Sequence, residues 1–337
     1  MSDTDAYAKA GVDQGAADSA VAGLVRALGT IELGRASRQV PLPGHYASVI
    51  KLDERLGIAL STDGVGTKLL VAEELERFDT VGIDCVAMNV NDVICVGAEP
   101  LAMLDYIAIE RADPAVCEQI GVGLARGAEL AGIEIPGGEL AQLGEMVRGF
   151  DVAGACFGAV ALDAIVDGSA VRPGDPVIGL PSSGIHSNGY TLARSALDGL
   201  PLDVDPEGRL GQPLGDVLLE PTEIYVKPVM ELLRSEVEVR GLAHITSGGL
   251  GNLLRLAAPV GYEIDDPLPV PPIFELIQER AAVGDAEMRD VFNMGCGFCC
   301  VVAGEDADAA LGLLRETYPA ARAIGEARAE RGVTAGA

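Results

Sequence analysis

The sequence predicts a two-domain α/β (α+β) protein with mixed sheets. Three observations carry this prediction: the length of 337 residues, a composition that is 49% hydrophobic with 43 glycines, and strand-like apolar runs that alternate with helical periodicity in both halves. A chain of this length can bury two cores. The turn-rich stretch 167–175 separates two apolar strands. We therefore expect a first domain over 1–168, a second over 169–330 and a tail over 331–337.

Periodicity and turn residues predict the elements of the first half. Apolar residues recur at helical spacing in 19–30, whereas 31–46 is rich in Gly, Pro and Arg and predicts a long loop. The pattern then predicts, in order, strands at 47–52 and 57–62, helices near 66–75 and 79–96, a strand at 98–109, a helix at 114–131, a short strand at 133–136 and a strand at 150–162.

The second half begins with a predicted strand at 176–180, a loop at 181–189 and a helix from Tyr190. The later segments predict helices near 222–235, 248–257 and 272–283, strands near 260–264 and 298–302, and a final helix at 305–317. Helices and strands therefore interleave in both halves, which is the basis for the predicted class.

Charge and composition exclude several classes of protein. The net charge of −27 argues against a nucleic-acid partner, because no basic stripe offsets it. No apolar run approaches the roughly 18 residues of a membrane span, and the acidic N-terminus lacks the features of a signal peptide. We therefore expect a cytoplasmic protein that does not bind membranes.

The cysteines predict free thiols. Seven is an odd number, spread thinly over a large chain, as is usual for reduced cysteines. The spacing Cys296-x-x-Cys299-Cys300 is compatible with a metal, but it has no second pair and merges into an apolar run. A core strand is the favoured interpretation.

The segment 61–68, Ser-Thr-Asp-Gly-Val-Gly-Thr-Lys, carries the densest chemistry in the chain. It follows an apolar run, so Asp63 is expected at the end of a buried strand as a ligand for a hard metal. Gly64 and Gly66 would let backbone N–H groups approach a phosphate, and Lys68 would supply a cation. The spacing is not that of a Walker A loop. The alternative is a glycine turn with a solvated lysine.

Two further acids extend this candidate site. Asp92 lies among Val and Ile in the predicted helix 79–96, where a partly buried carboxylate needs a partner. A Mg²⁺ ion shared with Asp63 would supply one. Glu139 follows paired glycines after the predicted strand, which gives a third carboxylate at a strand end. The alternatives are a capping aspartate and an ordinary turn glutamate.

The chain has three histidines. His186 lies in a turn rich in serine and glycine, and His244 precedes a predicted helix whose N-terminus would face an anion. These neighbours favour contact with substrate or anion for both. His45, on the long N-terminal loop, is expected to be structural.

These motifs together resemble phosphoribosylformylglycinamidine cyclo-ligase, the AIR synthetase family of purine biosynthesis. Tyr7–Asp13 also resembles the family's N-terminal signature, and the resemblance runs in order from about residue 7 to 327. The motifs that carry it are 61–68, 87–92 with 97–100, 182–190, 244–249 and 292–295.

The resemblance implies an ATP-dependent ring closure. ATP would phosphorylate the formyl oxygen of formylglycinamidine ribonucleotide, the ribosyl-bearing nitrogen would attack that carbon, and phosphate would leave as the imidazole forms. Such chemistry depends on positioning and charge neutralisation more than on a protein nucleophile. The resemblance also implies Mg²⁺, leaves a requirement for K⁺ open, and implies a homodimer whose N-terminal halves pair through strands into a barrel.

The resemblance assigns roles residue by residue. Those of the metal site are Asp63, Asp92 and Glu139. Those expected to bind ATP are Asp63, Gly64, Val65, Gly66, Thr67, Lys68 and Asn89. The substrate-binding residues would be Ser183, His186, Ser187, Asn188, Thr246, Ser247, Gly248 and Gly249. Those closest to the chemistry would be Asp63, Lys68, Asp92 and His244.

Two segments depart from the family pattern. Leu140 and Gln142 replace a hydroxyl and a carboxylate that usually follow the paired glycines. The N-terminal loop, usually richer in glycine, carries Arg35, Arg38 and His45 instead. The alternatives are therefore a relative that uses ATP on another substrate, such as a thiamine-phosphate kinase or a hydrogenase-maturation protein, or a nucleotide-binding paralogue without turnover.

Overall fold

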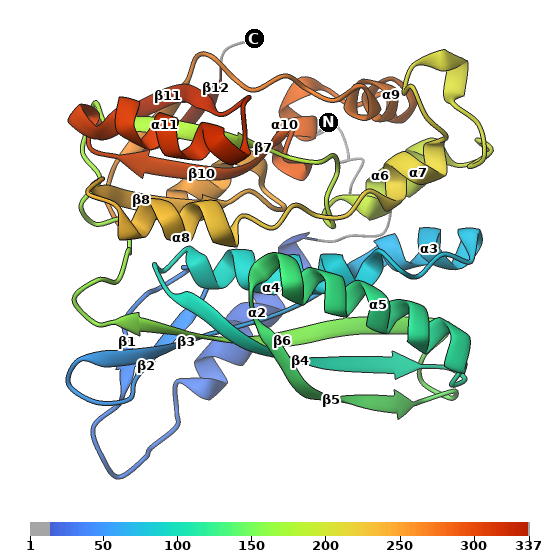
Figure 1. The fold of residues 1–337 in the computed structure, drawn as a ribbon, viewed down its shortest axis with the longest axis horizontal. Coiled ribbons are helices and arrows are strands. Elements are labelled where there is room, and N and C mark those ends of the chain that lie inside the picture. Colours follow the sequence, from blue (N-terminus) through green and yellow to red (C-terminus); the bar gives the residue numbers. More distant parts are fainter. Residues whose placement is uncertain (1–13, 336–337) are drawn as a thin grey trace.

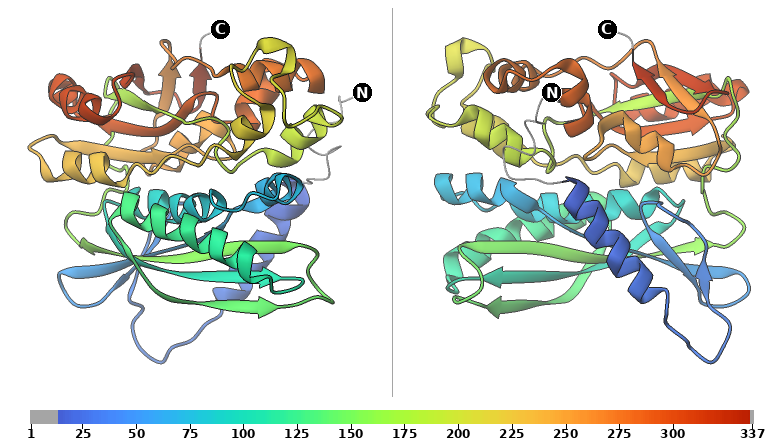
Figure 2. Two further views of the ribbon diagram at one scale, coloured as in Figure 1. Left: turned by 45° about the vertical axis from the view of Figure 1, so that its right-hand side comes forward. Right: turned by 180° about the vertical axis from the view of Figure 1, so that it is seen from behind.

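The structure is a computed structural model that describes residues 14–335, with two halves that each contain a six-stranded sheet (Figure 1). In the first half, helices α4 (Val81–Ile94) and α5 (Pro114–Ala131) cover one face of the sheet and separate it from the second half (Figures 1 and 2). Each sheet contains both parallel and antiparallel pairs, so the predicted α/β class with mixed sheets is confirmed. The Tyr7–Asp13 signature lies outside the described residues.

The first sheet has the strand order β1-β2-β3-β6-β4-β5, in which β4 and β5 are parallel. The elements of this half, besides α4 and α5, are α2 (Gln14–Leu28), β1 (Gln39–Val40), β2 (Ser48–Lys51), β3 (Leu56–Gly64), η1 (Gly66–Lys68), α3 (Leu69–Leu75), β4 (Glu99–Ile109), β5 (Glu134–Gln142) and β6 (Phe150–Ala161). The predicted loop 31–46 contains β1, which pairs with β2.

Strand β5 is longer than the sequence predicts. The interpretation of 133–136 as a short strand treats Pro136 and the following glycines as its end, whereas β5 continues to Gln142. Proline and glycine are tolerated here because β5 is the edge of the sheet, where a missing N–H and missing side chains cost little. Glu139 consequently lies within the strand and not at its end.

The second sheet has the strand order β12-β9-β11-β7-β10-β8, in which β12 and β9 are parallel. Its half contains β7 (Pro176–Pro181), α6 (Tyr190–Leu197), η2 (Pro206–Gly208), α7 (Leu214–Leu219), α8 (Val226–Arg234), β8 (Val239–His244), η3 (Gly249–Arg255), β9 (Gly261–Ile264), α9 (Pro272–Ala281), α10 (Asp285–Val291), β10 (Cys296–Val302), η4 (Gly304–Asp306), α11 (Ala307–Thr317), β11 (Arg322–Arg328) and β12 (Val333–Ala335).

Six of these elements were not predicted: η2, α7, β8, α10, β11 and β12. Strand β12 lies within the segment expected to be a tail. Strand β10 contains the predicted strand 298–302 and begins earlier, at Cys296; it is buried along its whole length, and all seven cysteines are free thiols. The core-strand and free-thiol predictions are therefore confirmed. Among the described residues, no helix is both long and apolar enough to cross a membrane.

Close contact between α4 and α5 depends on glycines. A Cβ atom on Gly82 would come within 2.2 Å of the backbone nitrogen of Leu124, and one on Gly123 within 2.6 Å of the backbone oxygen of Asp79. Asp113 caps the N-terminus of α5 by accepting from the backbone N–H of Ala115, ahead of which Pro114 takes the first helical position. The sequence thus fixes both the start of α5 and its distance from α4.

We expect Gly82→Ala to destabilise the protein. The added methyl group would clash with the backbone of α5, which cannot move aside as the end of a flexible side chain can. The free energy of unfolding should fall by about 1–3 kcal/mol. Gly121→Ala is the matched control on α5, because nothing lies within 4 Å of its Cβ position, and it should be neutral or stabilising by up to about 1 kcal/mol. Urea unfolding of the two variants measures both. Equal stabilities would contradict the close packing.

Candidate functional site

Two of the predicted carboxylates lie close together where α4 meets the end of β3. Asp63 is the penultimate residue of β3, and its backbone N–H donates to Asn89 Oδ1 at 3.0 Å. Burial raises the pKa of the Asp63 carboxyl, and the negative charge of Asp92 raises it further. Two mutually repelling, half-buried acids are an unfavourable arrangement that a cation would relieve.

Asp92 also links the two halves of the molecule. The Nδ1 atom of His244, the last residue of β8, lies 2.9 Å from Asp92 Oδ1. The imidazole is fully buried, and its Nε2 atom has no hydrogen-bond partner. The structure therefore brings together three predicted site residues: Asp63 of β3, Asp92 of α4 and His244 of β8.

The loop 182–189 is held by its own histidine. His186 has a left-handed backbone with φ 67°, and its Nε2 accepts a hydrogen bond from the Ser183 N–H at 3.2 Å. Burial lowers the pKa of His186 well below its usual value, so the imidazole is neutral. The side chain is 1% exposed. His186 thus braces the loop internally, and the half-buried Asn188 is the better-placed substrate residue.

The two predicted substrate loops contact each other. Ser247 Oγ donates to Asn188 Oδ1 at 3.2 Å. Thr246 is half-buried, whereas Ser247 and Gly248 are exposed. These side chains thus border the junction at which Asp92 and His244 meet.

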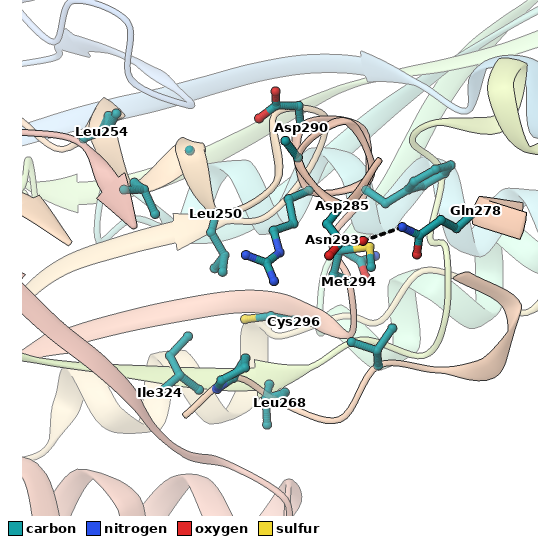
Figure 3. A pocket seen from close by; sticks show the side chains of 17 residues that line it. Leu250, Leu254, Leu268, Gln278, Asp285, Asp290, Asn293, Met294, Cys296 and Ile324 are labelled. Atoms are coloured by element: carbon teal, nitrogen blue, oxygen red, sulfur yellow. Dashed lines mark hydrogen bonds between the residues drawn. The ribbon is translucent and has the colours of Figure 1, made fainter. Parts of the chain in front are cut away.

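The segment Phe292–Gly295 supports the first loop from behind. Asn293 Nδ2 donates to the backbone oxygen of Gly184 at 2.9 Å, and Asn293 Oδ1 accepts from Ser182 Oγ at 3.0 Å. The same segment forms one wall of a largely apolar cavity of about 500 Å³ (Figure 3). Its labelled side chains, Leu250 and Leu268 among them, belong to the second half, and neither Asp63 nor Asp92 lines it.

Lys68 does not have the predicted role of a mobile phosphate-binding cation. Its side chain is completely buried, with Nζ 2.9 Å from Asp84 Oδ2 and 2.6 Å from the backbone oxygen of Glu220. A fully buried ammonium requires such a partner, because its desolvation is otherwise too costly. The lysine is therefore engaged within the protein.

The backbone cradle for phosphate is smaller than predicted. The Gly64 N–H donates to Asp63 Oδ1, and the Val65 N–H donates to the backbone oxygen of Val152 at 3.0 Å. Gly66 and Thr67 are exposed, and Gly66 has a positive φ of 73° with open space around it. These two residues are the part of the segment that a ligand can approach.

Asn89 is likewise structural, contrary to its predicted contact with ATP. Its Nδ2 donates to the backbone oxygens of Asp63 and Cys85, at 3.1 and 2.9 Å, and its side chain is buried. It fixes the end of β3, and hence the position of Asp63.

Glu139 does not converge with the other two acids in this chain. Strands β6 and β4 lie between β3 and β5, and Glu139 pairs in register with Tyr106, on the face away from α4. Within residues 14–335 no group of three or more His, Cys, Asp or Glu side chains could hold a metal ion. The predicted three-carboxylate cluster is therefore not formed by the described part of one chain.

The helix predicted at 248–257 is shorter and of another kind. It is the seven-residue 3₁₀ helix η3, and both Gly248 before it and its first residue, Gly249, have positive φ. A Cβ on Gly249 would lie 2.0 Å from the backbone oxygen of Arg289. The glycines thus serve close packing, and no long helix directs its N-terminus at an anion.

The N-terminal loop contributes residues that sequence reasoning left as structural. Tyr46 donates its hydroxyl to the Asn252 backbone oxygen at 3.0 Å, and the Arg255 guanidinium lies over its ring. The neighbouring His45 is mostly buried with neither ring nitrogen partnered, and the charge of Asp92 reaches it. The only indication in the sequence that His45 lies near the site was its position after Gly44 in a long loop.

Comparison with known proteins gives matches over both halves of the chain. Residues 44–160 match the family model described as AIR synthase related protein, N-terminal domain, and residues 172–336 match the model of the C-terminal domain. A phosphoribosylformylglycinamidine cyclo-ligase from Methanothermobacter thermautotrophicus is 53% identical over 84% of this chain and 83% of its own length. One from Pyrococcus furiosus is 49% identical over 93% and 92%.

Solved structures share the fold at lower identity. A complex of HypE with HypF gives a TM-score of 0.64 at 22% identity, covering 86% of this chain and 89% of that one. Thiamine monophosphate kinase from Aquifex aeolicus gives 0.63 at 18%, covering 94% and 96%. These likenesses establish the fold alone.

The depressed histidine pKa values predict acid sensitivity. Burial lowers the pKa of His45 to about 4 from its ordinary value of 6.5, so between these values the unfolded chain binds a proton that the folded chain does not. Stability is therefore full above pH 6.5 and falls as pH drops toward 4, by up to about 3 kcal/mol from this residue. In urea unfolding at pH 7 and pH 5, His45→Gln should lose less stability than the unsubstituted protein. An unchanged difference would contradict this assignment.

Proposed function

The chain belongs to the phosphoribosylformylglycinamidine cyclo-ligase family, and we infer that it catalyses the ATP-dependent cyclisation of formylglycinamidine ribonucleotide to aminoimidazole ribonucleotide. The reaction forms a C–N bond, releases ADP and phosphate, and belongs to purine biosynthesis. Cyclo-ligases at 45–53% identity support this activity, whereas the kinase and hydrogenase-maturation alternatives rest on structures at 18–22% identity.

The observation that carries the proposal is the junction of Asp63, Asp92 and His244 beside the two touching loops. Ring closure needs the reacting nitrogen and the activated formyl carbon to be held in contact, and it needs the phosphate charge to be neutralised. The loop residues Asn188 and Ser247 supply polar contacts for the ribonucleotide. The acids supply a site of negative charge that suits a cation carried by ATP.

We assign Mg²⁺ to Asp63 and Asp92. The oxygen donors are of the kind that Mg²⁺ prefers, and the repulsion between the two carboxylates is the observation that fits a cation there. When bound with ATP, the ion neutralises phosphate charge. The protein's own residues set its place, because Asn89 fixes the backbone of Asp63 and His244 holds one oxygen of Asp92. Glu139 joins this site only if another chain completes it.

The exposed Gly66 and Thr67 are the residues that we assign to the ATP phosphates. Thr67 lies at the border of the two halves, with its Oγ1 3.3 Å from Thr191 Oγ1. A nucleotide held there would lie across the junction. We also propose the division into domains 1–168 and 169–330. The residues assigned to Mg²⁺ and ATP then lie in the first domain, and the two substrate loops lie in the second.

We also propose that the enzyme is a cytoplasmic homodimer. The face of the first sheet turned away from α4 carries Leu104 and Tyr106 on alternate positions of β4, exposed by 41% and 44%. Helix α2 exposes four further large apolar side chains: Val21, Leu24, Val25 and Leu28. Apolar surface of this kind marks an interface, and strand pairing would also cover the edges of the sheet.

Incubation with formylglycinamidine ribonucleotide and Mg²⁺-ATP should yield ADP and aminoimidazole ribonucleotide in equal amounts. Asp92→Asn should lower kcat by about 100-fold or more with an unchanged fold. Asp53→Asn, in the exposed turn before β3, should not change it. Absence of the imidazole product would refute the cyclisation, and normal turnover of Asp92→Asn would remove that residue from the site. Omitting K⁺ tests whether it is needed as well.

Introducing charge on the outer face of the sheet should dissociate the dimer. The double variant Leu104→Glu/Tyr106→Glu is expected to be a monomer by light scattering, because burying two carboxylates in an interface is costly. Val122→Glu is the control, since Val122 is a similarly exposed apolar residue on α5. A dimer that survives the double variant, or a monomeric unsubstituted protein, would exclude this interface.

A further inference from the structure

Asp84 is a buried acceptor at the junction of the two halves. Its Oδ1 atom accepts from the Thr222 N–H and Thr222 Oγ1, both at 2.7 Å, and from Ser187 Oγ at 3.2 Å. It also accepts from Lys68 Nζ at 2.9 Å. One carboxylate of α4 thus binds groups from three other segments, two of which belong to the second half.

Lys68 is the ionic partner of this carboxylate. Both side chains of the ion pair are completely buried, and the Lys68 ammonium also donates to the Glu220 backbone oxygen. Such a pair contributes little net stability, because the desolvation of two ions offsets their attraction. Hydrogen bonds to an ionised acceptor are stronger than those to a neutral one. The pair therefore serves to make Asp84 a strong acceptor where the halves meet.

The hydrogen bond from Ser187 to Asp84 also positions the neighbouring residues of the candidate site. Asn188 follows Ser187 directly, donates to Met88 Sδ on α4 at 3.8 Å and accepts from Ser247 Oγ. Asp84, through Ser187, thus fixes the place of Asn188 and, through it, the contact with the second loop. Ser187 itself is buried and bonded to Thr222 Oγ1 at 2.9 Å, so its hydroxyl serves the loop and not a ligand.

We propose that Asp84 is a positioning residue for the cyclisation, acting through Ser187 to hold Asn188 against the nucleotide substrate. Its role in turnover rests on the proposed function, whereas its hold on the loop does not. The carboxylate does not touch the reacting atoms. It sets the loop to the position from which substrate is bound.

The test replaces the ion pair with apolar side chains. Asp84→Asn alone would leave a buried lysine unpaired and is expected to unfold the protein, so the informative variant is Lys68→Met/Asp84→Leu. Apolar replacement of a buried pair commonly preserves stability. The buried Thr222 N–H loses its acceptor in this variant. We therefore expect a folded protein with a lowered Tm, an increase in KM for formylglycinamidine ribonucleotide, and a fall in kcat/KM of about 10- to 100-fold.

A second variant shows whether the effect passes through the loop. Ser187→Ala should lower kcat/KM in the otherwise unsubstituted enzyme and have no further effect in the Lys68→Met/Asp84→Leu background. The control Arg77→Met/Asp216→Leu removes an ion pair that also joins the two halves but is nearly half exposed. That control should leave kcat/KM unchanged.

Hydrogen exchange of the peptide 182–190 gives a readout that does not need turnover. Exchange should rise in Lys68→Met/Asp84→Leu and stay unchanged in the control. If the unsubstituted enzyme makes no imidazole product but the exchange rises, the cyclisation is wrong and the positioning of the loop is right. The proposal would be overturned if Lys68→Met/Asp84→Leu had a normal kcat/KM or left the hydrogen exchange of peptide 182–190 unchanged. It would also be overturned if Ser187→Ala lowered kcat/KM equally in both backgrounds.

Discussion

One face of helix α4 fixes the relation between the two halves. Asp84, Met88 and Asp92 lie one turn apart, so their side chains point the same way. They contact Ser187, Asn188 and His244 respectively, all from the second half. A helix in the first half thus positions both predicted substrate loops. Gly82 and Gly123 set the distance between α4 and α5. The packing of α4 against α5 therefore determines where Asp84, Met88 and Asp92 meet the second half.

The charges on this face explain how a chain of net charge −27 can gather carboxylates at one place. Asp84 is neutralised by a buried lysine, whereas Asp92 has a histidine on one oxygen and the repelling charge of Asp63 nearby. The first arrangement is complete within the protein and therefore structural. The second is incomplete, and an incomplete buried charge is the feature that a cationic ligand satisfies.

The sequence predicted the fold class, the long strands and helices of the first half, and the proximity of Asp63 and Asp92. It expected Glu139 beside these two acids, whereas His244 is the residue that contacts Asp92. It missed β8 and β11, because their Arg and Gly residues interrupt the apolar pattern of a buried strand. These strands are buried only by the neighbouring strands of the folded sheet. It misjudged Lys68 for the same kind of reason: a lysine beside glycines reads as solvated, and its partner Asp84 lies 16 residues away. Continuing the helical face of Met88 and Asp92 by one turn would have reached Asp84.

The departures from the family pattern at Leu140 and Gln142 lie away from the junction of Asp63, Asp92 and His244. Gln142 ends the edge strand β5 and accepts from the Ala112 N–H at 3.4 Å, and Leu140 is exposed. Neither contacts Asp63 or Asp92, from which two strands separate β5. Glu139 instead shares the outer face with Tyr106, the surface assigned to the dimer. Its carboxylate therefore lies on the face proposed as the dimer interface, and not beside Asp63 and Asp92 of the same chain.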